Sequence, residues 1–241
     1  MSILNGIFGI AIIFFIAFLL SNNKKKINWR TVGIGFAIQL IFAFVALKWS
    51  VGQYVLGKLS LGIQSIIDYA KEGISFMFGS LSEDGSIFFV NVLTVIIFIS
   101  AIVSVLYYLG VMQFIIKILG GGLSKLLGTS KLESVSAAAN IFLGQTEAPL
   151  LIKPYVKKLT ESELFTVMVG GLASVSGSIL VGYSMLGIPI EYLISASFMA
   201  APAGLIMSKI LLPETADNKH LNGEFTMVKD DSANIVDAAS K

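Results

Sequence analysis

Five long apolar stretches limit most strongly what this chain can fold into. A helix needs roughly 20 mostly apolar residues to cross the hydrocarbon layer of a bilayer, which is about 30 Å thick. Charged residues make up only 13% of the 241 residues, about half the share found in a typical soluble domain. We therefore predict an all-α membrane protein with about five transmembrane helices. The stretches cover residues 3–20, 31–49, 87–109, 163–184 and 190–212.

The composition also removes several classes of function. The chain has no cysteine, which excludes disulfides and thiolate catalysis. The net charge is +2 and the basic residues are scattered, so there is no footprint for nucleic acid. The single histidine, His220, lies in a polar tail, away from the apolar surroundings of Glu147. Because that glutamate has no second catalytic group in the membrane interior, we expect the protein not to be an enzyme.

Positive charges set the predicted orientation. The loop between the first two stretches, SNNKKKINWR, carries Lys24, Lys25, Lys26 and Arg30, and short basic loops stay in the cytoplasm. The two transmembrane helices of residues 1–50 then place the N-terminus outside. The same alternation leaves the polar tail after the last stretch in the cytoplasm.

The predicted outer segment is residues 51–86. Within it, residues 54–72 repeat apolar groups at a helical period with polar residues opposite. Gly73 provides a stop signal for this helix. We expect an amphipathic helix that lies in the outer interface of the membrane. The alternative is a helix packed on other parts of the protein.

Residues 131–158 pose a different problem, because a polar triplet interrupts an apolar run. If this stretch crossed the membrane, Glu147 and Pro149 would lie at the bilayer centre, where a charged carboxylate costs a few kcal/mol. Both flanks are also basic, with Lys131 on one side and Lys157 on the other. A crossing would put one basic flank outside, against the charge bias. We therefore reject a sixth crossing.

A re-entrant hairpin explains the same residues. Its arms, 131–143 and 148–158, are each roughly 16–20 Å long at helical rise, which reaches the midplane and returns. Gly144 ends the first arm in a position where a left-handed residue is easily accommodated. Thr146 is the expected N-cap of the second arm, and Pro149 lies in its first turn, where the missing N–H does no harm.

The tip of this hairpin carries the candidate chemistry. At membrane depth such a turn is tolerated only where it is buried in protein or lines an aqueous cavity. Gln145, Thr146 and Glu147 would present an amide, a hydroxyl and a carboxylate to that cavity. The helix ends that meet there also leave backbone groups free to bind ions or ligands. The alternative is a structural turn whose polar groups are satisfied by neighbouring helices.

The stretch 163–184 is expected to break in its middle, where GGLASVSGS occupies residues 170–178. Each glycine costs about 1 kcal/mol relative to alanine in a helix, and serine hydroxyls compete for backbone carbonyls. A broken helix exposes carbonyl oxygens, which together with hydroxyl and amide oxygens suit a dehydrated Na⁺. The alternative is a packing seam of small residues. Before the break, Thr160 and Glu163 fit a capping box.

These motifs resemble a known family. GQTEAPL in 144–150, preceded by Asn140 and followed by the 170–178 motif, is similar to the first half of a bacterial concentrative nucleoside transporter. The similarity runs through essentially the whole chain. It implies a cation–nucleoside symporter of the bacterial plasma membrane, usually a homotrimer, with two inverted repeats and one re-entrant hairpin in each. Residues 87–212 would then form the first repeat.

The resemblance also implies roles for particular residues. Gln145, Thr146 and Glu147 would hydrogen-bond the nucleobase. Ile179, on the broken helix, would make an apolar contact with it.

The coupling ion would be held by oxygen ligands from the same two segments. The resemblance implies Asn140 and Ser174 as Na⁺ ligands through their side chains, and Leu143 and Val175 through their backbone carbonyls. Some family members use protons instead, and the Asn140–Ser174 pair favours Na⁺.

One departure from the family is serious. The family binds ribose with residues of the second repeat, and this sequence has no second hairpin. The tail, residues 213–241, ends in DDSANIVDAASK, where Asp231 or Ser232 is a candidate cap for a helical run. We interpret it as the truncated start of a second repeat, the alternative being a frayed terminus. A rival function is a non-transporting fragment or scaffold that needs a separate second half.

Overall fold

The structure, a computed structural model, describes residues 2–83, 87–216 and 232–240, and all regular elements in these ranges are helical. His220 and Asp231 lie outside the described residues. The elements in chain order are α1 (Ser2–Leu20), η1 (Lys24–Lys26), α2 (Trp29–Leu47), α3 (Ser50–Phe78), α4 (Ser80–Glu83), η2 (Phe89–Leu93), α5 (Thr94–Tyr108), α6 (Val111–Leu127), α7 (Lys131–Ala139), η3 (Ala148–Lys158), α8 (Glu161–Ala173), α9 (Gly177–Met185), α10 (Ile190–Leu211) and α11 (Ile235–Ser240).

Within the described residues, three helical segments are long and apolar enough to cross a membrane. They are α2, the continuous η2–α5 segment Phe89–Tyr108, and α10. Helix α1 has a shorter apolar part, Leu4–Leu20. The fourth predicted crossing, 163–184, is divided between α8 and α9. The all-helical class and an apolar, membrane-type composition are thus observed, and the number of five crossings stays a prediction.

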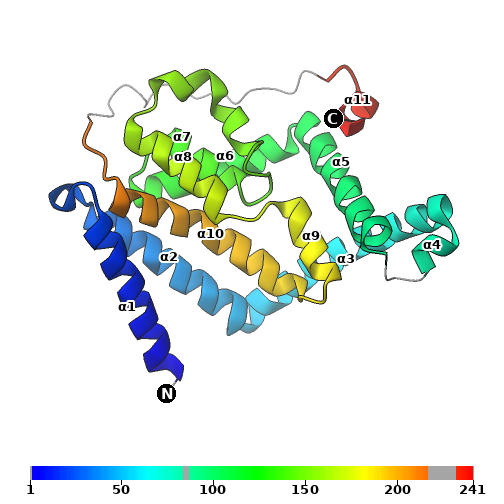
Figure 1. The fold of residues 1–241 in the computed structure, drawn as a ribbon, viewed down its shortest axis with the longest axis horizontal. Helices are drawn as coiled ribbons and strands as arrows, with labels where there is room; N and C mark the ends of the chain where they lie inside the picture. The colour runs from blue at the N-terminus through cyan, green and yellow to red at the C-terminus, as the bar shows by residue number, and fades with distance from the viewer. Residues whose placement is uncertain (1, 84–86, 217–231, 241) are drawn as a thin grey trace.

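Helices α2 and α10 form a closely packed pair, with α1 beside them (Figure 1). A β-carbon on Gly35 would lie 2.6 Å from a side-chain carbon of Ile206, so the missing side chain lets the two helices approach. The rings of Phe42 and Phe198 stack with centroids 5.5 Å apart. This pair supports one side of the segments that carry the site.

Helix α3 is longer than predicted. It passes Gly73 and ends at Gly79, whose φ of +54° lies in the left-handed region that favours glycine. The predicted amphipathic helix over 54–72 lies within it, with Leu56, Ile67 and Ile74 buried along one side. Gly73 is therefore not the stop signal.

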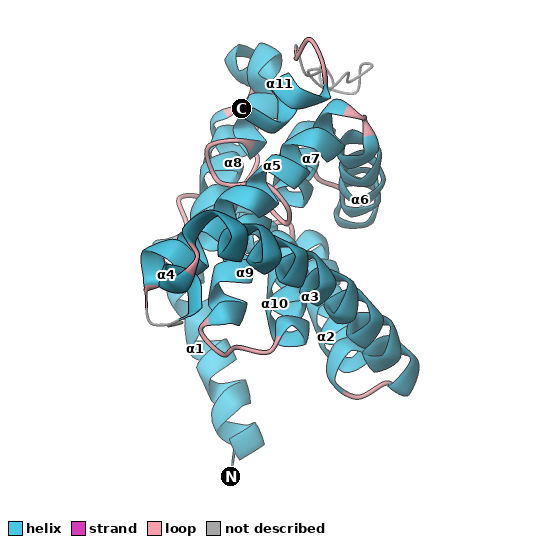
Figure 2. Ribbon diagram, turned by 90° about the vertical axis from the view of Figure 1, so that its right-hand side faces the viewer, coloured by secondary structure: helices cyan, strands magenta, loops and turns pink. Residues whose placement is uncertain are grey.

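The first arm of the predicted hairpin, α7, packs on α6 and α8 (Figures 1 and 2), and the second arm, η3, packs on α7 and α8. A β-carbon on Gly120 of α6 would lie 2.7 Å from the α-carbon of Val135 of α7, so these backbones are in close contact. Small residues on both helices permit this approach. The first arm is α-helical only to Ala139, and the second arm, η3, is a 3₁₀ helix.

The short C-terminal helix α11 packs against α5 (Figure 1). Its cap is Asn234, whose side-chain oxygen accepts a hydrogen bond from the backbone N–H of Asp237 at 2.9 Å. A helical run after Ser232 was predicted, but the sequence did not identify Asn234 as the capping residue.

Candidate functional site

The site is built on the turn between α7 and η3. Helix α7 begins with a capping box in which Ser130 Oγ accepts from the Glu133 N–H and Glu133 Oε1 accepts from the Ser130 N–H. The helix ends at Ala139, and turns carry the chain from Asn140 to Glu147. The small residues at the end of α7 are thus followed by a turn that contains the polar triplet Gln145, Thr146 and Glu147.

Two details of the predicted turn are wrong. Gly144 is not among the glycines with positive φ, so a left-handed residue does not end the first arm. Thr146 does not cap the second arm: the capping position is Glu147, in right-handed helical conformation and with no side-chain cap. Successive tight turns make a separate cap unnecessary, because the N–H groups of Glu147 and Ala148 both donate to the carbonyl of Gly144 at 3.0 Å. The predicted proline in the first turn, Pro149, is present.

The helix break lies directly beside this turn. Helix α8 starts with the predicted Thr160–Glu163 capping box, which is confirmed, and ends at Ala173. Ser174 is extended, with φ −116° and ψ 165°, and α9 begins at Gly177. The interruption falls within the glycine- and serine-rich motif.

Backbone contacts hold the turn in place. The N–H of Gly177 donates to the carbonyl of Phe142 at 3.0 Å, which joins the start of α9 to the turn. On the other side, Ser197 of α10 donates its hydroxyl to the carbonyl of Ile141 at 3.0 Å, in a buried position. The ring of Phe142 also meets Phe198 edge to face, with centroids 6.0 Å apart. The turn is therefore fixed between α9 and α10.

Asn140 is the most unusual polar residue of the site. It is only 1% exposed, and neither its side-chain oxygen nor its side-chain nitrogen has a hydrogen-bond partner. Buried amides are almost always hydrogen-bonded, so an amide without a protein partner is suited to bind a water molecule or an ion. A β-carbon on Gly170 would lie 3.2 Å from Asn140 Nδ2, which places the amide against α8.

The predicted ion ligands therefore come from two segments in contact. Ser174 Oγ donates to the carbonyl of Gly170 at 2.7 Å, so Gly170 contacts both Asn140 and Ser174. Leu143 lies in the turn, three residues after Asn140. Val175 lies in the break, one residue after Ser174. Neutral amide, hydroxyl and carbonyl oxygens suit a monovalent cation.

The predicted nucleobase residues are exposed at the tip, and only one of them lines a described cavity. This cavity, of about 490 Å³, is bordered by Glu147 together with Phe142, Leu143 and α5. Glu147 Oε2 accepts from the backbone N–H of Gly144 at 3.2 Å, so the carboxylate folds back over the turn.

The other substrate predictions fare differently. Gln145 lies against α8, since a β-carbon added to Gly171 would be 3.1 Å from the β-carbon of Gln145. Thr146 and Ile179 are not among the residues that line the 490 Å³ cavity, and Ile179 is 44% exposed on α9. The structure therefore places Gln145 beside α8 and Glu147 at the cavity, and leaves the apolar contact of Ile179 untested.

Three polar residues of α5 also line the cavity and were missed from the sequence. Ser100, Ser104 and Tyr107 lie at intervals of four and three residues, which places them on one helical face. This spacing within an otherwise apolar stretch was a readable signal. Their hydroxyls give the cavity hydrogen-bonding groups opposite Glu147.

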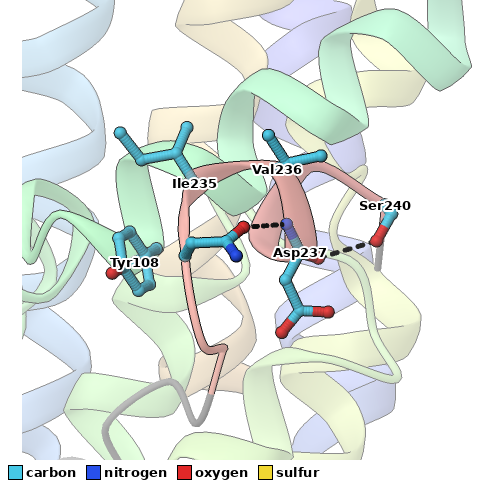
Figure 3. A pocket seen from close by; sticks show the side chains of 6 residues that line it. Tyr108, Ile235, Val236, Asp237 and Ser240 are labelled. Atoms are coloured by element: carbon cyan, nitrogen blue, oxygen red, sulfur yellow. Dashed lines mark hydrogen bonds between the residues drawn. The ribbon is translucent and has the colours of Figure 1, made fainter.

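The end of α11 also lines the 490 Å³ cavity, through Ala239 and Ser240. A second, more open cavity of about 710 Å³ lies between α11 and Tyr108 of α5 (Figure 3). Ile235 and Val236 border it, and within α11 the Ser240 hydroxyl donates to the carbonyl of Asp237 at 2.9 Å. Polar side chains make up most of the rest of its lining, namely those of Tyr108, Asn234, Asp237 and Ser240.

Three family models match successive parts of this chain. Residues 8–81 match the family model "Na+ dependent nucleoside transporter N-terminus", residues 89–189 match "Nucleoside recognition", and residues 192–241 match "Na+ dependent nucleoside transporter C-terminus". The nucleoside recognition match contains the turn, the break and the 490 Å³ cavity's α5 wall. The three matches follow one another along nearly the whole chain.

Curated relatives and solved structures agree with the family models. An uncharacterized transporter of Bacillus subtilis, YutK, is 52% identical over 100% of this chain and 60% of its own length. The nucleoside permease NupC of Helicobacter pylori is 48% identical over 88% of this chain and 53% of its own length. A structure described as CNTnw in an inward-facing substrate-bound state superimposes with a TM-score of 0.90, at 47% identity, over 100% of this chain and 58% of that one.

The chain thus spans 53–60% of the length of these three proteins. Along the chain, the matches to the N-terminus and C-terminus models of the Na⁺ dependent nucleoside transporter flank the match to the nucleoside recognition model. The chain belongs to the Na⁺ dependent nucleoside transporter family.

Proposed function

We propose that this chain provides the nucleobase- and cation-binding half of a nucleoside:Na⁺ symporter in a bacterial plasma membrane. Residues 87–212 form the first repeat, whose hairpin 131–158 enters from the cytoplasm and returns to it. Residues 1–50 supply two further transmembrane helices, with the N-terminus outside. The single observation that carries the proposal is the buried amide of Asn140, which lacks a protein partner beside a broken helix.

The proposed ion site combines groups from the turn and from the break, two segments that are in contact through Gly170 and Gly177. Asn140 and Ser174 provide side-chain oxygens, and Leu143 and Val175 provide backbone carbonyls. A cation bound there would satisfy the orphaned oxygen of Asn140 and neutralise part of the cost of burying it. All four ligands are uncharged, which matches a monovalent ion better than a divalent one. Proton coupling would need a titratable group at this position, and Asn140 is not one.

The proposed nucleobase site lies on the cavity side of the same turn. Glu147 borders the cavity and accepts hydrogen bonds, and Gln145 and Thr146 can both donate and accept. Ile179 of α9 is proposed as the apolar contact. Because the ion ligands and the base ligands share one turn, binding of the cation would order the turn for the nucleoside, which is the basis of coupling. Ribose contacts and the trimer of the whole transporter belong to the longer protein.

A binding measurement on the purified chain tests this proposal. A ligand that binds only the folded state stabilises it by about 2.7 kcal/mol at 100 times its dissociation constant. We expect Na⁺ to raise the thermal unfolding midpoint relative to choline, and uridine to raise it further in Na⁺. Glu147→Gln removes the charge at the base site, so it should abolish the uridine effect and leave the Na⁺ effect.

Glu161→Gln is the matched control. Glu161 is exposed in the first turn of α8, so this variant makes the same charge change away from the turn. It should keep both ligand effects. A chain that ignores Na⁺ and uridine, yet co-purifies with a full-length relative, would favour the scaffold function and contradict the symporter proposal.

A further inference from the structure

Buried polar atoms without partners concentrate where α7 faces α8. Among the described residues, five buried side-chain atoms without a hydrogen bond lie on these two segments: Glu133 Oε2, which is ion-paired with Lys209, Ser136 Oγ, both side-chain atoms of Asn140, and Glu163 Oε1. Ser136 and Glu163 are each 0% exposed. Buried groups of this kind are normally satisfied by an ordered water or an ion.

One end of this α7–α8 contact is fixed by Lys209 of α10. Its ammonium nitrogen lies 2.7 Å from Glu133 Oε2 of α7 and 2.9 Å from Ser162 Oγ of α8. Lys209 is only 6% exposed, and Glu214 lies 3.8 Å from the same nitrogen. One ammonium group thus joins the starts of both helices.

A small cavity of about 190 Å³ opens beside this end. Its lining includes the carboxylates of Glu133 and Glu214 and the ammonium groups of Lys26 and Lys209. These formal charges balance, and Thr129 and Ser130 add hydroxyl groups to the lining. This end of the α7–α8 contact therefore opens on a polar cavity.

The other end of the contact is the proposed ion site, where Asn140 lies against Gly170. Between the two ends, the polar residues lie on one face of each helix. On α7 they are Glu133, Ser136 and Asn140, at intervals of three and four residues. Such intervals place side chains one above the other on a helix.

Helix α8 repeats the pattern at intervals of four residues, with Ser162, Thr166 and Gly170. Thr166 is 2% exposed, and its hydroxyl donates to the carbonyl of Ser162 at 2.8 Å. That bond leaves its oxygen able to accept another hydrogen bond or contact a cation. Lys209 joins the two faces at one end, and the Asn140–Gly170 contact joins them at the other. Ser136 and Thr166 therefore lie between these ends, one turn from Lys209, in what we call the α7–α8 seam.

We propose that this α7–α8 seam is a polar path along which the coupling cation passes between Asn140 and the Lys209 end of the molecule. The path rests on the proposed function, because it leads to the ion site assigned there. Ser136 and Thr166 supply hydroxyl oxygens midway, and Lys209 closes the outer end by pairing with Glu133. Ionisable and polar groups buried in membrane proteins commonly mark ion paths of this kind.

Cysteine labelling at Ser136 tests the path, because the chain has no cysteine of its own. Ser136→Cys is nearly isosteric, and Ala139→Cys is the matched control: Ala139 is equally buried on α7 but belongs to the apolar cluster formed with α6. The probe is 2-aminoethyl methanethiosulfonate, a small cation, applied to the purified chain without nucleoside. We expect it to label Ser136→Cys and not Ala139→Cys.

Sodium supplies the second arm of the experiment. If the path leads to the ion site, a Na⁺ concentration about ten times the dissociation constant should slow labelling of Ser136→Cys about tenfold relative to choline. Equal labelling of the two cysteines, no labelling at Ser136, or labelling that ignores Na⁺ would each overturn the path. Stabilisation of the unmodified chain by Na⁺, measured in parallel, separates these failures from failure of the ion site itself.

Discussion

Replacing Gly177 by alanine tests the contact that joins the polar turn to the broken helix. A β-carbon at this position would lie 2.8 Å from the carbonyl oxygen of Phe142. Carbon–oxygen contacts in proteins are normally about 3.3 Å or longer, so the two backbones must separate by about 0.5 Å. The φ of Gly177 is not positive, so alanine meets a steric obstacle and no conformational one.

The size of the effect follows from the same contact. The Gly177–Phe142 hydrogen bond is 3.0 Å long, and a shift of about 0.5 Å would take it past the about 3.2 Å limit of a good N–H···O bond. Overpacking typically costs about 1–3 kcal/mol and a lost hydrogen bond about 0.5–1.5 kcal/mol. We expect a loss of about 2–3 kcal/mol, which lowers the unfolding midpoint of a chain of this size by roughly 4–12 °C.

The assay is thermal unfolding of the purified chain followed by helical circular dichroism. Gly121→Ala is the control, because a β-carbon on Gly121 of α6 would have no neighbouring atom within 4 Å beyond the backbone of its own helix. That change should be neutral or stabilise by up to about 1 kcal/mol. If Gly177→Ala unfolded at the same temperature as the parent and kept its response to Na⁺, the packing of the turn against the break described above would be wrong.

Two further predictions concern the ends of the helices. Lys209→Met leaves the buried carboxylate of Glu133 without its partner at 2.7 Å, so unfolding should become easier by about 3–5 kcal/mol; adding Glu133→Gln should restore most of the loss, and a double variant no more stable than the single one would contradict the pairing. Ser130→Ala and Thr160→Ala each remove a capping side chain and should each cost about 1 kcal/mol in chemical denaturation. The serine variant Thr160→Ser should keep the stability of the parent, and a loss equal to that of alanine would argue against capping.

Local chemistry made part of this structure predictable. The capping box of Thr160 and Glu163 follows from residue type and spacing alone, and the structure contains it. The break of the helix after Ala173 follows from glycines and serines that weaken a helix at its centre. Pro149 occupies the first turn of its arm, where the backbone N–H that proline lacks would have no partner within the helix.

Tertiary contacts decided what the sequence left open. Helix α3 passes Gly73 because one glycine costs only about 1 kcal/mol, and burial of Ile74 one residue later offsets that cost. The tip did not need Thr146 as a cap, because the carbonyl of Gly144 already takes the free N–H groups of the second arm. Such compensation depends on the path of the chain and leaves no local signal.

The cavity wall on α5 shows a different limit. Ser100 and Ser104 share a helical face with Tyr107, yet nothing in their spacing says that this face meets Glu147. Similarly, the buried ion pair of Lys209 and Glu133 joins residues far apart in the sequence. The individual motifs were readable from the sequence, and their partners across the fold came from the structure.

The central claim is that residues 131–158 dip into the membrane and return to the side from which they came. Lys131 and Lys157 are exposed at the outer ends of the two arms, and the chain has no native cysteine. The most direct measurement is labelling of Lys131→Cys and Lys157→Cys, one at a time, by a membrane-impermeant thiol reagent in right-side-out and inside-out vesicles. We predict that both cysteines react only in inside-out vesicles. Reaction of the two cysteines from opposite faces would contradict the hairpin and, with it, the proposed half-site.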